Sequence, residues 1–251
     1  HLIGSIQAGR VSAAPFILLA VESSPMDQLQ CGKVWAERVF PNSGEPLWRG
    51  DVYKNERIRV GYVSADFHQH ATAYLMAGLF ESHDRNKFEV TGFSFGVDDH
   101  SQMRQRLEHA FDHFIDVRSI GDEEVARTIR SREIEILVDL KGITQDARAG
   151  IFVRRPAPIQ VNYLGYPGTM ASEHFDYVIG DGRIIQEGDR AYYSEKVVTL
   201  PFSYQANDDK RVISDKALSK AECGLPDDSF VYCCFNQAYK IAPEIFDCWM
   251  S

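Results

Sequence analysis

The sequence predicts an α/β fold in which a Rossmann-like parallel sheet is wound with helices. The first observation is that short apolar segments with strand character alternate with helical patterns from Arg57 onward. This alternation predicts right-handed crossovers and parallel strand pairing. The second observation is a polar corner between the first of these strands and the next helix. Open α/β folds bind ligands at such corners, so a candidate site lies near the start of this domain.

Length and composition are those of an ordinary globular protein. The chain has 251 residues, of which 44% are hydrophobic and 25% are charged. A net charge of −9 argues against a nucleic-acid surface or a patch for anionic membranes. The longest apolar run, residues 16–21, is too short to span a bilayer, and the chain begins without a signal-peptide pattern. Five scattered cysteines without metal spacing predict reduced core thiols in a cytoplasmic protein.

Residues 1–50 predict a helical connector. Amphipathic helices are expected over residues 15–21 and 28–40, where apolar residues recur at helical spacing. Residues 41–46 (PNSGEP) predict a turn-rich linker. Because the chain begins with His1 and shows no internal repeat, we interpret this part as an adaptor to residues upstream.

Residues 55–205 are the predicted Rossmann-like domain. Its expected strands are 58–64, 88–95, 114–117, 134–140, 159–163 and 177–180. Its expected helices are 72–83, 101–111, 123–132 and 147–153. Neither a G-x-G-x-x-G fingerprint nor a P-loop motif occurs, which argues against a dinucleotide-binding protein and a P-loop NTPase. The Asp doublets at 98–99, 208–209 and 227–228 lie in turn-like sequence, so no metal site is expected.

Residues 206–251 predict the start of a second α/β unit. A polar helix is expected over residues 214–222, then a turn at 224–228 and a strand at 230–235. Pro243 marks the first turn of another helix. One strand and one short helix cannot bury a core of their own. We therefore expect the natural protein to continue beyond Ser251.

The corner after the first strand contains Asp66, His70 and Thr72. An imidazole takes up protons near neutral pH, since its ordinary pKa is about 6.5. A carboxylate four residues away can orient it or stabilise the imidazolium. The alternative is structural, with Asp66 in a turn and Thr72 as the cap of the following helix. The pattern alone leaves both interpretations open.

Two other stretches carry candidate chemistry. The strand at 159–163 leads into Gly165-Tyr-Pro-Gly168, whose glycines allow close approach to a ligand or simply form a tight turn. In residues 236–240 (NQAYK), a lysine precedes a helix N-terminus, a combination that suits a phosphate group. The alternative there is a solvated lysine. Neither stretch identifies a function by itself.

Taken together, these stretches resemble the catalytic region of the protein O-GlcNAc transferases, in particular the bacterial members in which tetratricopeptide repeats precede it. The resemblance covers residues 57–251, and residues 15–40 are similar to the helical connector after the repeats. The matching strings are VGYVSADFHQHATAYL, LVDLKGITQDARAGIFVRRPAPIQVNYLGYPGT, DYVIGD, YSEK and FNQAYKIAP.

The resemblance implies an inverting, metal-independent glycosyltransferase of the GT-B type, in which two Rossmann-like halves face a cleft. Residues 55–205 would be the acceptor-side half, and residues 206–251 the incomplete start of the UDP-binding half. The implied reaction transfers N-acetylglucosamine from UDP-GlcNAc to Ser or Thr hydroxyls of proteins, without a cofactor. Tetratricopeptide repeats upstream would recruit the protein acceptors.

The resemblance also implies roles for individual residues. His70 would act near the acceptor hydroxyl beside Asp66, and either group is a candidate for the base. Lys240 would stabilise the diphosphate leaving group, because a metal-free reaction needs positive charge there. The residues implied at the nucleotide-sugar are Thr72, Leu164, Gly165, Pro167, Gln237 and Tyr239.

Two departures from the family pattern leave alternatives open. Ile143 stands where an aromatic residue or histidine is usual, and the His-Thr-Thr-Gly stretch that grips UDP is absent. We therefore expect this polypeptide alone to show little or no transferase activity. One alternative is the same fold with another donor, such as UDP-glucose or GDP-fucose. The other is a binding or scaffold protein that keeps the fold without turnover.

Overall fold

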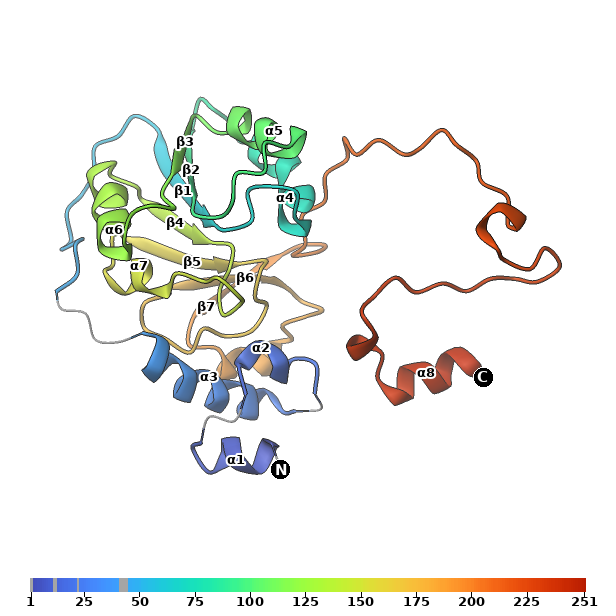
Figure 1. Ribbon diagram of the computed structural model, residues 1–251. Helices are drawn as coiled ribbons and strands as arrows, with labels where there is room; N and C mark the ends of the chain where they lie inside the picture. The colour runs from blue at the N-terminus through green and yellow to red at the C-terminus, as the bar shows by residue number, and fades with distance from the viewer. Residues whose placement is uncertain (1, 11–12, 22, 41–44) are drawn as a thin grey trace. The chain divides into compact units, whose positions relative to one another are not determined.

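A seven-stranded parallel sheet is the centre of residues 1–209, with the strand order β3-β2-β1-β4-β5-β6-β7 (Figure 1). The structure, a computed structural model, describes residues 2–10, 13–21, 23–40 and 45–251. The strands are β1 (Ile58–Ser64), β2 (Phe88–Ser94), β3 (His113–Asp116), β4 (Ile136–Asp139), β5 (Ile159–Tyr163), β6 (Tyr177–Asp181) and β7 (Lys196–Leu200). All neighbouring strands pair in parallel, which confirms the expected α/β class.

Helices form the crossovers between the first five strands. In chain order they are α4 (Ala71–Glu81), α5 (Gln102–Ala110), α6 (Asp122–Ser131) and α7 (Ala149–Val153). Each helix expected between these strands forms, with ends that differ by a few residues from the prediction. The 3-10 helix η1 (Glu187–Tyr192) precedes β7. The sequence prediction missed β7, although its residues KVVTL have the β-branched composition typical of a strand.

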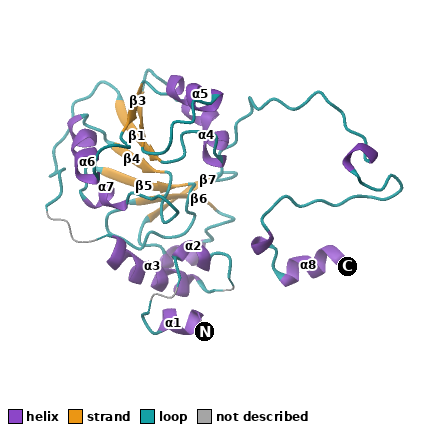
Figure 2. Ribbon diagram, viewed as in Figure 1, coloured by secondary structure: helices purple, strands orange, loops and turns teal. Residues whose placement is uncertain are grey.

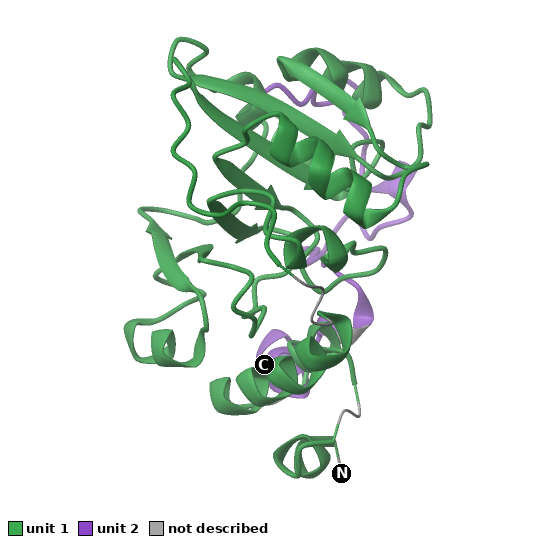
Figure 3. Cartoon of the chain, turned by 90° about the vertical axis from the view of Figure 1, so that its left-hand side faces the viewer, with its two compact units in different colours: residues 1–209 green, residues 210–251 purple. Residues whose placement is uncertain are grey.

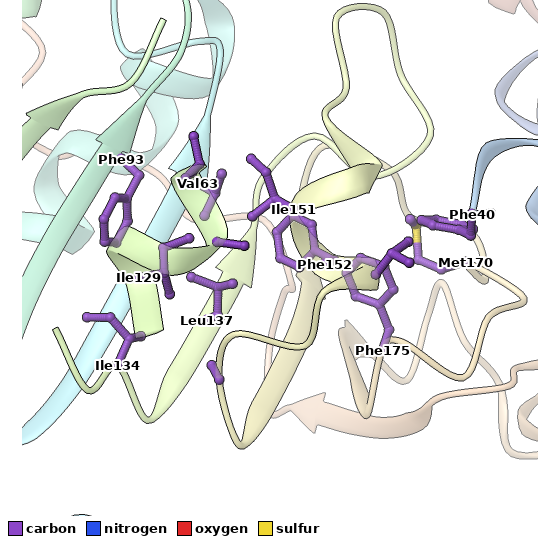
Figure 4. Close-up of a cluster of buried hydrophobic side chains, with 14 of the residues drawn as sticks. Phe40, Val63, Phe93, Ile129, Ile134, Leu137, Ile151, Phe152, Met170 and Phe175 are labelled. Carbon is purple, nitrogen blue, oxygen red and sulfur yellow. The ribbon is translucent and has the colours of Figure 1, made fainter. Parts of the chain in front are cut away.

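The sheet is covered on both faces, which explains why its central strands are apolar on both sides. On one face, Val60 of β1 shares a buried cluster with Phe80 of α4. On the other, Val63 shares a buried cluster with Ile129 of α6 and Phe152 of α7 (Figure 4). The two sets of helices lie on opposite sides of the strands (Figure 2). Successive residues of β1 thus serve two separate cores.

The strand order reverses at β1. The chain adds β2 and β3 on one side of β1 and then crosses to place β4 on the other side. The register pairs Val63 of β1 with Asp139 of β4, so the loops that follow these two strands leave the sheet side by side. In open α/β sheets, ligands bind outside the carboxyl ends of the strands at such a switch point.

The described residues before the sheet form the helices α1 (Leu2–Gln7), α2 (Pro15–Leu18) and α3 (Pro25–Val39). α3 begins with a capping box, in which Ser24 Oγ accepts from the Asp27 N–H at 3.2 Å and the Asp27 carboxylate accepts from the Ser24 N–H at 3.1 Å. Phe40, directly after α3, is buried in the same cluster as Val63, so this segment packs onto the sheet domain. The expected helices at 15–21 and 28–40 correspond to α2 and α3. Residues 41–44 of the expected linker lie outside the described residues.

Residues 210–251 form a separate unit (Figure 3). They contain the 3-10 turns η2 (Ala221–Cys223) and η3 (Ala238–Lys240) and the helix α8 (Pro243–Met250). The expected strand at 230–235 is wrong, because this segment is irregular and Phe235 is exposed. Residues 210–251, all of which are described, contain no other strand that would accept its backbone hydrogen bonds. The expected helix at 214–222 is also wrong, since only η2 forms there.

The cysteines differ from the expected core thiols. All are free, but only Cys31 is buried, whereas Cys223, Cys233, Cys234 and Cys248 are exposed. These four lie in residues 210–251, which bury almost no side chains. None of the described helices is both long enough and apolar enough to cross a membrane.

Phe93→Ala should lower the free energy of unfolding by about 3–5 kcal/mol, because the ring is fully buried beside Ile129 and its removal leaves a cavity (Figure 4). Urea unfolding followed by circular dichroism measures the loss. Phe202→Ala is the matched control, since this ring is 92% exposed and its removal should change stability by less than about 0.5 kcal/mol. Equal losses in both variants would contradict the burial of Phe93.

Candidate functional site

The loop after β1 brings Asp66, His70 and Thr72 together at the start of α4. His70 is the N-cap of this helix, and its Nδ1 accepts from the Thr72 N–H at 3.2 Å. The Thr72 hydroxyl donates to Asp66 Oδ2 at 3.4 Å. The Asp66 N–H donates to Ser64 Oγ at 2.9 Å, which holds the loop against the end of β1. The expectation that Thr72 caps this helix is wrong, because the structure makes His70 the N-cap and Thr72 the residue whose N–H it accepts from.

Lys141 is a member of this corner that sequence reasoning missed. It follows β4, and its Nζ lies 3.0 Å from Asp66 Oδ1 and 2.9 Å from Asp66 Oδ2. Both side chains are buried, with exposed fractions of 9% for Lys141 and 8% for Asp66. The ion pair therefore joins the loops after β1 and β4 at the point where the strand order reverses.

Asp139, the last residue of β4, fixes the backbone of Lys141 through a hydrogen bond. Its Oδ1 accepts from the Lys141 backbone N–H at 2.8 Å. Burial disfavours the charged carboxylate and raises the pKa of Asp139 to about 6. The hydrogen bonds from the Lys141 and Gly142 backbones and the charge of Lys141 oppose this shift, while the charge of Asp66 adds to it.

His70 is half-buried, and neighbouring charges of both signs act on its imidazole ring. Partial burial lowers the pKa of its imidazole, whereas the Asp66 carboxylate raises it. The charges of Lys141 and His68 lower it further. The net result is a pKa below the ordinary value of a histidine, so the ring is neutral at neutral pH.

The loop that follows β5 is held close to the loop that follows β4. Leu164 has a positive φ of 68°, an uncommon backbone conformation for a leucine. At Gly165, a Cβ atom would lie 2.1 Å from the Leu140 carbonyl oxygen, so only glycine fits there. The Asn162 side chain donates to the Tyr166 carbonyl at 3.0 Å, and Tyr193 donates to the Pro167 carbonyl at 3.3 Å. Leu164, Gly165 and Pro167 therefore lie in a loop of defined shape.

An open pocket of about 660 Å³ lies beside the corner. Its lining includes Asp66 and His68 from the loop after β1, Gly96 from the loop after β2, and the cationic side chains of Arg118 and Arg148. Arg104 of α5 braces this side, because its Nη1 donates to the Phe67 carbonyl at 3.1 Å and to Ser94 Oγ at 2.8 Å. The pocket therefore lies at the carboxyl end of β1.

Gln237, Tyr239 and Lys240 lie in the separate unit of residues 210–251. Gln237 is the N-cap of η3, and Lys240 is the last residue of this turn. The lysine is exposed, and α8 begins three residues later at Pro243. The expected juxtaposition of a lysine and a helix N-terminus is therefore present within this unit. Throughout the described residues, no three His, Cys, Asp or Glu side chains gather as they would around a metal ion.

Residues 47–217 and 210–251 match the model of glycosyl transferase family 41. The whole chain is 35% identical to SEC, a probable UDP-N-acetylglucosamine–peptide N-acetylglucosaminyltransferase of Arabidopsis thaliana, and spans 26% of that protein. A UDP-N-acetylglucosamine–peptide N-acetylglucosaminyltransferase of Caenorhabditis elegans is 34% identical over 70% of the chain, which spans 16% of that relative.

A solved structure of a mutant O-GlcNAc transferase from Thermobaculum terrenum is similar to this fold, with a TM-score of 0.74 and 28% sequence identity. The match covers 93% of this chain and 44% of that chain. The chain thus spans less than half the length of these relatives. The comparisons confirm the resemblance to the protein O-GlcNAc transferases and the expected glycosyltransferase fold class.

Lys141→Met should lower the free energy of unfolding by about 3–5 kcal/mol, because it leaves the Asp66 carboxylate buried without its counter-charge. Urea unfolding at neutral pH measures the effect. Lys87→Met is the matched control: this lysine is 73% exposed beside Asp84, and its loss should change stability by less than about 1 kcal/mol. A small effect in both variants would show that the buried pair contributes little.

Stability should also fall as the pH rises from about 4 to about 6, through Asp139. Its pKa is raised to about 6 in the folded protein, so over this range the folded state keeps a proton that the unfolded chain has lost. The protonated Asp139 thereby adds about 3 kcal/mol to the free energy of unfolding. This stabilisation is fully present below the pKa of the unfolded chain and is lost by about pH 6.

Asp139→Asn removes this titration while it keeps an oxygen acceptor for the Lys141 N–H. We expect the unfolding free energy of the wild type, relative to the variant, to fall by about 3 kcal/mol between about pH 4 and pH 7. Chemical unfolding at a series of pH values gives this difference. A difference that stays constant or grows with pH would contradict the raised pKa.

Proposed function

Because this chain belongs to glycosyl transferase family 41, we propose that the protein transfers N-acetylglucosamine from UDP-GlcNAc to Ser or Thr hydroxyls of proteins. The observation that carries this proposal is the corner at the β1–β4 switch point, where hydrogen bonds and an ion pair connect Asp66, Lys141, Thr72 and His70. This corner lies inside the family match, which covers most of the chain. The names of the relatives from Arabidopsis thaliana and Caenorhabditis elegans support UDP-GlcNAc as the donor and a peptide as the acceptor.

The reaction that we propose inverts the anomeric carbon and needs no metal. The acceptor oxygen bonds to the anomeric carbon while the sugar–phosphate bond breaks, and its electron pair leaves on UDP. Most of the acceleration then comes from holding the acceptor in line and from stabilising the charge that develops on the diphosphate. Lys240, exposed just ahead of the N-terminus of α8, is suited to the second task. Gln237 and Tyr239 would accompany it at the donor.

On the acceptor side, the corner and the pocket beside it would receive the hydroxyl-bearing segment. Leu164, Gly165 and Pro167, in the loop after β5, would close over the donor sugar. The proposal includes no cofactor beyond the donor, a cytoplasmic location, and tetratricopeptide repeats upstream that recruit protein acceptors. Residues 1–50 would act as the connector to these repeats, residues 55–205 as the acceptor-side half, and residues 206–251 as the start of the donor-side half.

A sugar-transfer assay on the intact protein tests this function. Radiolabelled UDP-GlcNAc, UDP-glucose and GDP-fucose are offered separately with cell lysate as a source of acceptors. We expect incorporation from UDP-GlcNAc alone, and a loss of about 10²- to 10³-fold in kcat/KM for Lys240→Ala. Lys216→Ala, which removes another exposed lysine of the same unit, is the control and should keep full activity.

The other outcomes separate the alternatives. Incorporation from UDP-glucose or GDP-fucose would keep the fold and overturn the donor. No incorporation from any donor by a folded protein would favour a binding or scaffold role. Equal activity in the Lys240→Ala and Lys216→Ala variants would remove Lys240 from the reaction.

A further inference from the structure

The hydrogen bonds around His70 determine which of its ring nitrogens carries the proton. A neutral imidazole has one N–H donor and one acceptor nitrogen. Nδ1 accepts from the Thr72 N–H at 3.2 Å, because His70 caps helix α4 through its side chain. Nε2 therefore carries the hydrogen in the neutral ring. In the described part of the chain no group forms a hydrogen bond with Nε2, and the ring is 42% exposed, so this N–H is available to a substrate.

A nearby carboxylate could reverse this arrangement. Where a carboxylate accepts a hydrogen bond from Nδ1–H, Nε2 is left as the basic nitrogen, as in a hydrolase triad. Asp66 is close enough to compete for this role, since its Oδ2 lies 3.6 Å from His70 Nδ1. That separation is too long for a hydrogen bond. A small movement of the carboxylate would close it.

Lys141 prevents that movement. Its ammonium lies 3.0 Å and 2.9 Å from the two oxygens of Asp66, and the Thr72 hydroxyl also donates to Oδ2. The Asp66 oxygen nearest the ring, Oδ2, is thus already held by two donors other than His70. Because both members of the pair are buried, neither can exchange its partner for water without a large desolvation cost.

We propose that Lys141 is a positioning residue of the transferase site, which withholds Asp66 from His70 and so makes the imidazole a hydrogen-bond donor through Nε2–H in place of a base. The catalytic part of this role rests on the proposed function. The protonation of the His70 ring, in contrast, is a property of the folded chain alone. The charged and titratable groups that face the ring are Asp66 and His68 from its own loop and Lys141 from the loop after β4. Asp99, after β2, lies 4.0 Å from His68.

The consequence for the reaction concerns the proton of the acceptor hydroxyl. When the acceptor oxygen bonds to the anomeric carbon and UDP leaves with the electron pair, this proton passes to water or to the phosphate oxygens. His70 instead donates its Nε2–H to a lone pair of a reacting oxygen and orients it. Lys141 itself touches no substrate and acts through Asp66.

Nitrogen NMR of the chain labelled with ¹⁵N-histidine tests the protonation pattern directly. Long-range proton–nitrogen spectra distinguish a protonated ring nitrogen from an unprotonated one, and the His70→Gln spectrum identifies the signals of His70. At neutral pH we expect His70 to have protonated Nε2 and unprotonated Nδ1. A ring with protonated Nδ1 would overturn the proposal.

The Lys141→Met variant tests the role of the ammonium. Without it, Asp66 is free to accept from the ring, so we expect His70 to change to the Nδ1–H form and its pKa to rise. Lys87→Met, which removes an exposed lysine beside Asp84, is the control and should leave both properties unchanged. An unaltered His70 in folded Lys141→Met would overturn the proposal.

Asp66→Asn provides a second variant should Lys141→Met not fold. It removes the competing carboxylate, so we expect His70 to keep the Nε2–H form and its pKa to fall. A change to Nδ1–H, or a rise in the pKa, would overturn the proposal. Because these spectra need neither donor nor acceptor, their outcome is independent of the sugar-transfer assay.

Discussion

The buried ion pair between Lys141 and Asp66 is the interaction on which the site depends. It connects positions 75 residues apart in sequence, and the two loops meet because β1 and β4 are neighbours in the sheet. A buried pair offsets its desolvation only when further hydrogen bonds hold both partners. Thr72 supplies one to Asp66, and the backbone of Lys141 is itself bonded to Asp139. The strand order thus brings the two side chains together, and their contact in turn fixes the position of Asp66 beside His70.

Much of this region could be predicted from sequence because its determinants are local. Residues 58–64 have the same bounds in the prediction as in β1, since the strand is apolar on both faces and ends in a polar corner. Asp66, His70 and Thr72 could be grouped because they lie within one loop. The identity of the cap of α4 could not be predicted: threonine is the commoner capping residue, but the structure places His70 at the N-cap, where its ring nitrogen accepts from the Thr72 N–H.

The remaining features depend on contacts between residues far apart in sequence, which no local sequence pattern indicates. A lysine side chain is ordinarily solvated, and Lys141 is buried because it forms an ion pair with Asp66, which is distant in sequence. Its one local signal is its place directly after a buried strand, beside Asp139, and the prediction considered only Ile143 of that loop. The segment 230–235 has strand composition, but strand formation requires a partner. β7 also has strand composition, and it forms because β6 is its partner.

The central claim, that Asp66 and Lys141 act as one unit, is tested most directly by a double-mutant cycle of unfolding free energies. The four proteins are the wild type, Asp66→Asn, Lys141→Met and the double variant, compared by urea unfolding at neutral pH. A buried pair predicts that the double variant loses less stability than the sum of the two single losses, with a coupling above about 1 kcal/mol. Additive losses, with a coupling near zero, would show that the two side chains act independently and would contradict the proposed role of Lys141.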